Sequence, residues 1–288
     1  MTFDLVANVV IAGVLTGLVY GLMALGLSVI FGVVRVVNFA HGEMMTVAMY
    51  ACTVLFAALR LDPFLCIVPV AVFFFLFGTV LQAGLINPFI TRPEHSQFML
   101  MVAVAIIMVN GLLLAFGPDA RNVLVDYQLE TFEIGKLFVD KARLYAALAA
   151  LAATAGLFLF FRFSKTGKAI RACADNYQGA KVVGLNVKKY YALTFGLGSV
   201  CVAVAGCAMV LLVDVSPPLG PAYTLLAFVI VIVGGMGSMA GALLGGILIG
   251  VSEALAGLFI APSAKSMFSF GLLILVLLFR PQGLLGKK

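Results

Sequence analysis

The hydrophobic positions of this chain form long, nearly unbroken runs separated by short polar stretches. A helix of roughly 20 apolar residues crosses a bilayer core about 30 Å thick, and runs of that length recur along the whole chain. The pattern predicts an all-α transmembrane bundle of about 8 to 10 helices with broken or re-entrant segments. The predicted helices cover residues 5–34, 40–59, 64–86, 97–117, 143–161, 190–213, 222–239, 240–260 and 266–280.

The first run is unusual in its length. Thirty residues rise about 45 Å as a helix, which is too long for one upright span and too short for two. Residues 5–34 therefore form either a steeply tilted span or a half-helix followed by a span. The first ten residues lack the basic flank and cleavage site of a secretory signal, and we expect them to begin the bundle. Residues 1–288 are expected to form a single transmembrane domain.

Composition strengthens this interpretation, because 64% of the residues are hydrophobic and only 10% are charged. The net charge of +6 does not indicate a nucleic-acid partner, since a basic excess in a membrane chain marks its cytoplasmic loops. The cysteines form no CxxC pair and are expected to be packing residues rather than metal or redox groups. They are Cys52, Cys66, Cys173, Cys201 and Cys207.

Charge also predicts the sidedness of the loops. Residues 162–189 carry seven basic residues against one acid, so this loop is expected in the cytoplasm. Residues 118–143 carry five acids against four bases, and the loop 118–142, one span earlier, is expected outside. The C-terminal Arg280, Lys287 and Lys288 place the C-terminus in the cytoplasm. The N-terminus is then external with nine spans or internal with ten.

The basic loop contains a helical pattern of its own. Ile170, Cys173, Ala174 and Tyr177 follow the spacing of one helix face, and the pattern ends at Gly184. We expect a short amphipathic helix whose exposed face carries Ala169, Ala172, Gly179 and Ala180. Such a helix either lies on anionic lipid headgroups or contacts another protein. Lipid-binding helices carry Phe, Leu or Trp on the apolar face, so the alanines favour a protein partner.

A polar cluster interrupts the apolar pattern at "VVNFAHGEMM", residues 36–45. It contains Asn38, His41, Gly42 and Glu43. Glu43 and Glu253 are the two carboxylates that lie inside predicted spans. A charge at membrane depth costs about 2.5 to 3.5 kcal/mol, so such residues usually face the interior and serve function. The alternative is structural: a carboxylate can cap a helix N-terminus or join two helices. His41 has no second ligand nearby, and no metal site is predicted.

The sequence "GGMGSMAGALLGGILIG", residues 234–250, is a second break. Gly234, Gly235, Gly237 and Ser238 can interrupt the helix, and the spacing of Gly246 and Gly250 favours close helix packing. A phosphate-binding loop is excluded, because no Lys-Ser or Lys-Thr follows the glycines. Both breaks follow an apolar run and precede a small-residue helix. We therefore consider them possible repeats that form a translocation pathway or gate, where helix N-termini would favour a carboxylate group.

Five segments together resemble a known family. They are "VVNFAHGE" (36–43), "TGKAIRACADNYQGAKVVGLNV" (166–187), "ALTFGLGSVCVAVAG" (192–206), "VIVGGMGSMAGALLGGILIGVSEAL" (231–255) and "LLILVLLFRPQGLLG" (272–286). The chain resembles the permease subunits of ATP-binding-cassette importers for branched-chain amino acids. The resemblance implies that residues 164–184 form a coupling helix that docks on an ATPase, and the residues that match the family there are Gly167, Ala169, Arg171, Ala172, Asp175, Ala180 and Gly184. Asn176-Tyr177 departs from the family, which tends to continue the acidic character of Asp175.

The resemblance also implies the partners and the cargo. The expected importer contains a second related permease, two cytoplasmic ATP-binding subunits that hydrolyse ATP, and an external or periplasmic substrate-binding protein. The permease itself would be a multi-pass protein of the bacterial inner membrane, neither an enzyme nor a cofactor protein, that moves Leu, Ile and Val by alternating access. Urea, short amides and other amino acids remain alternative substrates. An ion-coupled secondary transporter would need paired ionisable residues within spans, and a membrane enzyme would need clustered acid, base or metal groups.

Overall fold

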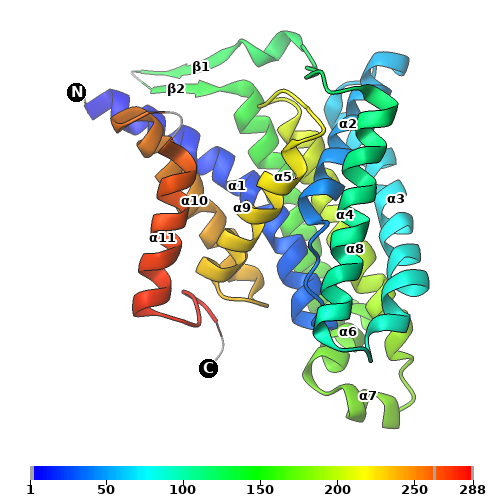
Figure 1. The fold of residues 1–288 in the computed structure, drawn as a ribbon. Helices are drawn as coiled ribbons and strands as arrows, with labels where there is room; N and C mark the ends of the chain where they lie inside the picture. The colour runs from blue at the N-terminus through cyan, green and yellow to red at the C-terminus, as the bar shows by residue number, and fades with distance from the viewer. Residues whose placement is uncertain (1–2, 136, 262–263, 287–288) are drawn as a thin grey trace.

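A computed structural model describes residues 3–135, 137–261 and 264–286 (Figure 1). The α-helices are α1 (Phe3–Val34), α2 (His41–Leu59), α3 (Pro63–Leu81), α4 (Glu94–Phe116), α5 (Lys141–Phe163), α6 (Lys165–Asp175), α7 (Tyr177–Val182), α8 (Val187–Met209), α9 (Leu219–Gly234), α10 (Met239–Phe259) and α11 (Lys265–Phe279). A π-helical turn (Gln82–Ile86) and a 3₁₀ turn (Asn87–Phe89) extend α3, and a second 3₁₀ turn covers Asp126–Gln128. Strands β1 (Thr131–Ile134) and β2 (Leu137–Asp140) form an antiparallel hairpin.

The helices confirm the predicted membrane bundle. Within the described residues, seven helices are long and apolar enough to cross a membrane, and α9 and α11 are shorter apolar helices. Two details differ from the prediction. The bundle is not purely helical, because the loop before α5 contains the β1–β2 hairpin. The helix predicted at 222–239 ends at Gly234, because Gly235 and Gly237 adopt positive φ angles of 103° and 80° that glycine tolerates best.

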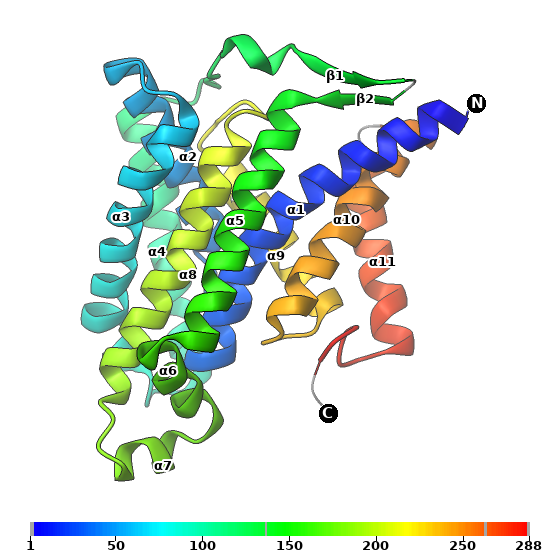
Figure 2. The ribbon, with the colours of Figure 1, turned by 180° about the vertical axis from the view of Figure 1, so that it is seen from behind.

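The helices run between two ends of the bundle (Figures 1 and 2). We call the end with β1 and β2 the hairpin end and the end with α6 and α7 the basic end. The long helix α1 starts at the hairpin end and crosses the bundle obliquely as one continuous helix. Of the two predicted alternatives, the structure therefore has the tilted span and not the half-helix followed by a span. The C-terminal segment returns to the end of α9 at the basic end, where Leu285 N donates to Gly234 O over 2.9 Å. Lys287 and Lys288 lie outside the described residues.

Helices α1 and α10 make the most extensive helix contact of the described chain. A Cβ placed on Gly246 would lie 2.4 Å from Gly21 Cα, and one on Gly250 would lie 2.5 Å from Gly17 Cα. Both distances are far below an ordinary contact, so only glycine allows this approach. The close packing predicted from the Gly246–Gly250 spacing is thus confirmed, and α1 supplies a complementary Gly17–Gly21 pair.

Burial separates the inner from the outer helices. Most of α1 and α8 is buried, whereas α3 and α4 leave many large apolar side chains exposed. Since lipid tails are as apolar as these side chains, the outer faces of α3 and α4 are suited to lipid.

The hairpin-end loop is tied to the bundle by side chains and backbone. Tyr127 Oη donates to Asp62 Oδ2 over 2.8 Å, and Arg121 pairs with Val215 as an isolated β-bridge. Burial and the nearby Asp62 carboxylate raise the pKa of the Tyr127 phenol well above its ordinary value. The phenol therefore stays protonated and able to donate throughout the physiological range.

Candidate functional site

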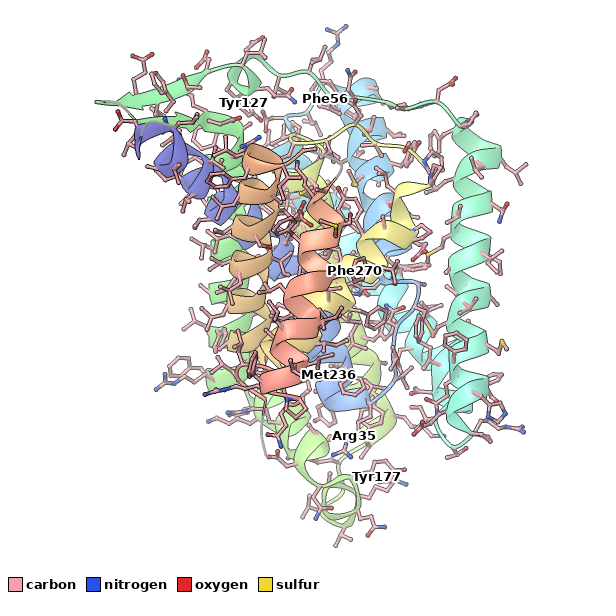
Figure 3. The ribbon with its side chains drawn as sticks, turned by 60° about the vertical axis from the view of Figure 1, so that its left-hand side comes forward. Arg35, Phe56, Tyr127, Tyr177, Met236 and Phe270 are labelled. Atoms are coloured by element: carbon pink, nitrogen blue, oxygen red, sulfur yellow. The ribbon has the colours of Figure 1, made fainter. Side chains whose placement is uncertain are left out.

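The first break carries the chain from the basic end back into the bundle. Helix α1 ends at Val34, Arg35 adopts a positive φ of 58°, and residues 35–38 have no regular structure. Figure 3 places Arg35 near Tyr177, at the basic end. The side chain of Asn38 accepts a hydrogen bond from Ala40 N over 3.0 Å, which closes the turn that starts α2. Asn38 thus satisfies a freed backbone group, as polar residues before a helix often do.

His41, the first residue of α2, fixes the depth of this helix start. Its Nε2 lies 2.9 Å from Met23 O and donates to it, because a carbonyl oxygen can only accept. Met23 lies eleven residues before the end of α1, which is about 16 Å along a helix. The other ring nitrogen, Nδ1, is buried without a hydrogen-bond partner among the described residues. Helix α2 therefore begins well inside the bundle.

Glu43 faces α9 through a three-part contact. Thr224 Oγ1 donates to Glu43 Oε2 over 2.7 Å and accepts from Gly42 N over 2.8 Å. The helices are so close that a Cβ on Gly42 would lie 2.1 Å from Gly220 O. Glu43 is only 4% exposed, and Thr224 satisfies one carboxylate oxygen together with one free N–H of the helix start. The geometry of Glu43 is that of a carboxylate that joins two helices.

The second break is a short turn between α9 and α10. Gly234, Gly235, Gly237 and Ser238 span this turn, and Ser238 Oγ caps α10 by accepting from Gly241 N over 3.1 Å. The turn packs on the end of α1, because a Cβ on Gly32 would lie 3.2 Å from Gly237 Cα. Helix α10 therefore begins at the basic end of the bundle.

The two breaks share composition but differ in geometry. The first starts its helix deep in the bundle, whereas the second is a tight turn at the basic end. Near the end of α1, Gly32 packs on Gly237 and Ser28 Oγ donates to Ser238 O over 3.3 Å. The two helix N-termini therefore lie at different depths of the bundle, and their facing a translocation pathway stays a prediction. The second break is held in place by close packing of its glycines, and the first by buried hydrogen bonds.

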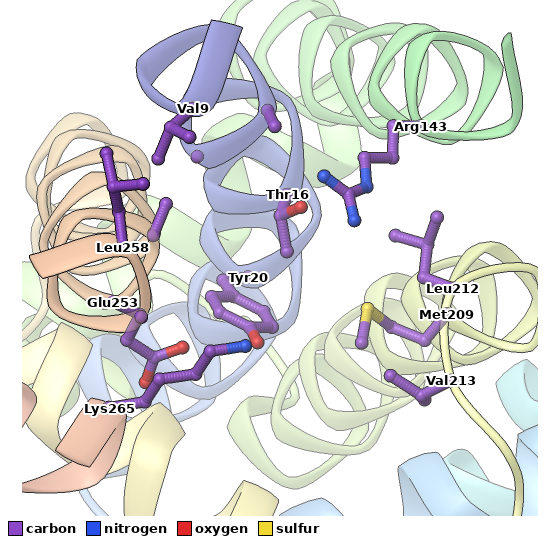
Figure 4. Close-up of a pocket in the computed structure, with 15 residues that line it drawn as sticks. Val9, Thr16, Tyr20, Arg143, Met209, Leu212, Val213, Glu253, Leu258 and Lys265 are labelled. Atoms are coloured by element: carbon purple, nitrogen blue, oxygen red, sulfur yellow. The ribbon is translucent and has the colours of Figure 1, made fainter. Parts of the chain in front are cut away.

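Glu253 lies in a different part of the molecule, on a cavity of about 440 Å³. Helices α1, α5, α10 and α11 and the end of α8 line this cavity (Figure 4). The lining residues come from the N-terminal half of α1, the start of α5 and the ends of α8 and α10, which places the cavity in the hairpin half of the bundle. The described chain thus keeps its two intramembrane carboxylates apart, Glu43 in a helix contact and Glu253 on a cavity.

Charged groups stand on opposite walls of this cavity. Figure 4 shows the Arg143 guanidinium pointing in from α5, with Glu253, Tyr20 and Lys265 together on the other side. Glu253 Oε1 accepts from Ser269 Oγ over 2.8 Å and also interacts with Tyr20 and Lys265. Arg143 Nε lies 3.7 Å from Asp140 Oδ2, in a pair that is partly exposed. The cavity therefore presents a cation on one wall and a carboxylate on the other.

The basic loop forms two helices where one was expected. Helix α6 ends at Asp175, and Asn176 Oδ1 caps α7 by accepting from Gly179 N over 2.8 Å. Val183 and Gly184 follow α7, and Gly184 has a positive φ of 84°, so the predicted end at Gly184 lies two residues beyond the last residue of α7. The loop projects from the bundle at the basic end (Figure 1).

The exposed face of this loop is confirmed only in part. Arg171, Ala172 and Asp175 are exposed and Ala169 is half-buried. Ala180 is buried, contrary to the prediction, because α7 turns this residue inward. Gly167 is also buried, and a Cβ there would lie 2.5 Å from Phe160 O, so this glycine packs α6 on α5. The largely exposed apolar pair Val182 and Val183 in this loop is an addition to the predicted surface.

Sequence reasoning missed several of these groups. Thr224 and Tyr20 are single polar residues within long apolar runs, and a hydropathy value averaged over a run does not reveal them. Arg143 and Lys265 lie at the starts of helices, where a basic residue is usually taken as a flank. Reading each polar residue near a span as a candidate partner for Glu43 or Glu253 could have found all four.

The fold defines a class, that of multi-pass membrane proteins with interrupted helices and polar groups held in the bundle interior. The chain belongs to the family described as the branched-chain amino acid transport system permease component, whose model matches residues 9–277. It is 30% identical to the high-affinity branched-chain amino acid transport system permease protein LivH of Salmonella typhimurium, over 96% of this chain and 94% of that protein.

Two further relatives carry similar names. The corresponding permease protein BraD of Pseudomonas aeruginosa is 30% identical, over 96% of this chain and 94% of that protein. The probable branched-chain amino acid transport permease protein LivH of Methanocaldococcus jannaschii is 27% identical over 92% of this chain and 88% of that protein. The similarity therefore extends over nearly the full length in each case, and the chain belongs to a family of membrane transport permeases.

Proposed function

We propose that this chain is the membrane-spanning subunit of an ATP-binding-cassette importer that moves leucine, isoleucine and valine across the bacterial cytoplasmic membrane. One observation carries the proposal: the family match covers residues 9–277, and the relatives are named for branched-chain amino acid transport. In this proposal residues 1–288 act as a single transmembrane domain. The permease has no ATPase site of its own, and partner subunits hydrolyse ATP.

The partners are a second related permease, two cytoplasmic ATP-binding subunits and an external substrate-binding protein. The shape of the basic loop supports the ATPase contact, because α6 and α7 project from the bundle. The loop exposes Arg171, Ala172 and Asp175 together with the apolar pair Val182 and Val183. A mixed surface of apolar and charged groups suits a protein cleft better than headgroups alone. We assign α6 and α7 to ATPase coupling, with Gly167, Ala180 and Gly184 shaping the loop.

The orientation follows from charge. The basic end carries the seven basic residues of the loop 162–189, so we place it in the cytoplasm. The hairpin end, with the loop 118–142, is then outside. In this orientation the N-terminus is external, the C-terminus is cytoplasmic, and nine membrane helices connect the two.

ATP-driven movement would reach the bundle through the basic loop. Alternating access requires parts of the bundle to move as rigid bodies. Gly42 and Glu43 hold α2 against α9 through Thr224. Asn38 closes the turn before α2, and His41 ties the start of α2 to Met23 of α1. We propose that these residues shape the pathway, that the turn of Gly234, Gly235, Gly237 and Ser238 is a gate element, and that Glu253 lines the pathway itself.

Reconstitution of the importer tests the proposal. The chain would be co-expressed with the proposed second permease, ATPase and binding-protein subunits from the same organism, purified, and placed in proteoliposomes. We expect ATP-dependent uptake of radiolabelled leucine that unlabelled isoleucine and valine suppress. Excess urea and short amides should leave uptake unchanged.

Two results would contradict the proposal. Uptake that is suppressed by urea or amides but not by isoleucine would move the substrate to another class within the same importer type. Purification without any nucleotide-binding subunit, with uptake that persists after ATP depletion and follows an ion gradient, would indicate a secondary transporter.

A further inference from the structure

The cavity in the hairpin half has the chemical features of a small-molecule site. Its volume of about 440 Å³ falls within the roughly 300–1,000 Å³ typical of ligand pockets. Such pockets combine apolar walls with a few polar groups that fix orientation. Here Met209, Leu212 and Val213 form an apolar wall, and the charged groups stand apart from one another.

The separation of charges is the informative feature. The guanidinium of Arg143 enters from α5 beside Thr16, while the Glu253 carboxylate lies across the cavity on α10 (Figure 4). Arg143 Nε lies 3.7 Å from Asp140 Oδ2. A guanidinium carries five N–H groups, so those on the other two nitrogens can still donate to a ligand. An α-amino acid carries a carboxylate and an ammonium on one carbon, and a cation and a carboxylate on facing walls of one cavity can bind both groups.

We propose that this cavity binds an α-amino acid with an aliphatic side chain, with Arg143 holding the carboxylate, Glu253 and Tyr20 holding the ammonium, and Met209, Leu212 and Val213 contacting the side chain. The assignment rests on the proposed function and locates one substrate site for it. Guanidinium–carboxylate pairs are strong and directional, so Arg143 would set the orientation of the bound molecule.

Lys265 balances the charge of Glu253 on the same wall of the cavity. It lines the same wall as Glu253 and interacts with that carboxylate. A carboxylate at membrane depth is costly without a compensating charge, and Lys265 supplies that charge from the start of α11. A substrate ammonium takes over this role when it binds, which frees the lysine side chain to move toward solvent.

The position of the cavity matches an entry site. All of its charged lining groups lie in the hairpin half of the bundle, which the proposed orientation places outside. A second cavity of about 220 Å³ shares Val9, Ala12 and Arg143 and continues to Phe138 on the hairpin. The two cavities together lead from the hairpin to Glu253. A substrate released at the outer face would therefore meet Arg143 first.

Binding to the purified importer in nanodiscs, without the binding protein, tests this site directly. The probes are radiolabelled leucine, leucine methyl ester, which lacks the carboxylate charge, and isocaproate, which lacks the ammonium. We expect unlabelled leucine to compete and the two analogues to compete at least about tenfold less well, since each loses one charge-assisted contact. Arg143→Gln and Glu253→Gln should weaken leucine binding by a similar factor.

Matched controls separate loss of the site from loss of the fold. Arg92→Gln and Glu133→Gln remove the same charges from exposed positions outside the cavity and should bind leucine as the unaltered protein does. Arg143→Lys keeps a cation and should restore part of the binding. Arg143→Gln should also lose the preference for leucine over its methyl ester, which a folding defect would not produce.

The outcomes distinguish the two proposals. If the importer takes up leucine but Arg143→Gln and Glu253→Gln bind and transport it unchanged, the cavity assignment is wrong and the proposed function stands. If the unaltered importer takes up no amino acid, the proposed function fails and the assignment fails with it. Equal competition by all three probes would also overturn the assignment.

Discussion

At the scale of single residues, Glu43 answers why a carboxylate lies in the apolar part of this chain. Thr224 donates to it and accepts from Gly42 N, so one hydroxyl serves a charged side chain and an unsatisfied helix N–H together. Buried polar groups cost free energy mainly when a partner is missing. The cluster that looked like a chemical site in the sequence is, in this structure, a joint between α2 and α9.

Substitution of Thr224 tests that joint. Thr224→Val keeps the shape but removes both hydrogen bonds, and we expect it to lower the free energy of unfolding by about 1–3 kcal/mol. Thr224→Ser keeps the hydroxyl and should cost far less. Thermal unfolding of both purified variants in one detergent measures the difference, and equal melting temperatures would show that the hydroxyl contributes little.

Gly42 offers a steric test of the same contact. In Gly42→Ala the new Cβ would lie 2.1 Å from Gly220 O and 2.3 Å from Thr224 N, so α2 and α9 must separate. We expect a loss of about 1–3 kcal/mol, as for other overpacked sites. Gly111→Ala is the matched control, because nothing lies within 4 Å of that Cβ position on α4. A glycine inside a helix is unfavourable by about 0.5–1 kcal/mol relative to alanine, so the control should be neutral or stabilising.

At the scale of elements, α6 and α7 show which residues can serve docking. Gly167 and Ala180 face inward, while Arg171 and Ala172 are exposed. Substitution of Arg171 or Ala172 should therefore affect assembly with the ATPase. Substitution of Gly167 or Ala180 should instead affect the folding of the loop itself. A bulky residue at an exposed alanine obstructs close approach without disturbing the helix.

We expect Arg171→Glu and Ala172→Phe to reduce recovery of the ATPase in a pull-down of the tagged permease, by about tenfold if one charged or packed contact is lost. Membrane insertion and yield should not change. Lys168→Ala, at another exposed position of α6, measures the effect of lost charge alone. Unchanged recovery of the ATPase with both variants would favour a lipid contact for α6.

The elements also show how far the sequence predicts this structure. Runs of about twenty apolar residues predicted the membrane helices, because length and hydropathy are local properties. The division of α6 from α7 was also local, since Asn176 is a good helix cap, but the helical periodicity across it concealed the signal. The meeting of Glu43 with Thr224 joins residues 181 positions apart. The facing of Arg143 and Glu253 likewise depends on the packing of four helices, which no local pattern contains.

At the scale of the whole molecule, the two ends differ in kind. The hairpin end has an irregular, mixed-charge loop held by Tyr127 and Asp62, and the basic end has the α6–α7 projection. The cavity on Glu253 opens the interior in the hairpin half, while close glycine packing closes the bundle near Gly32 and Gly237. This asymmetry is what an importer open to one side requires, if the hairpin end faces outward.

Cysteine labelling tests that orientation. The native cysteines are all buried, so a membrane-impermeant maleimide should leave the unaltered protein unlabelled in intact cells. Leu129→Cys and Val182→Cys place thiols at positions that are 92% and 87% exposed, at the hairpin and basic ends. We expect the reagent to label Leu129→Cys in intact cells and Val182→Cys only after the membrane is opened, because basic loops stay in the cytoplasm. The reverse order of labelling would invert the topology, and with it the assignment of the basic loop to the ATPase and of the cavity to the outer face.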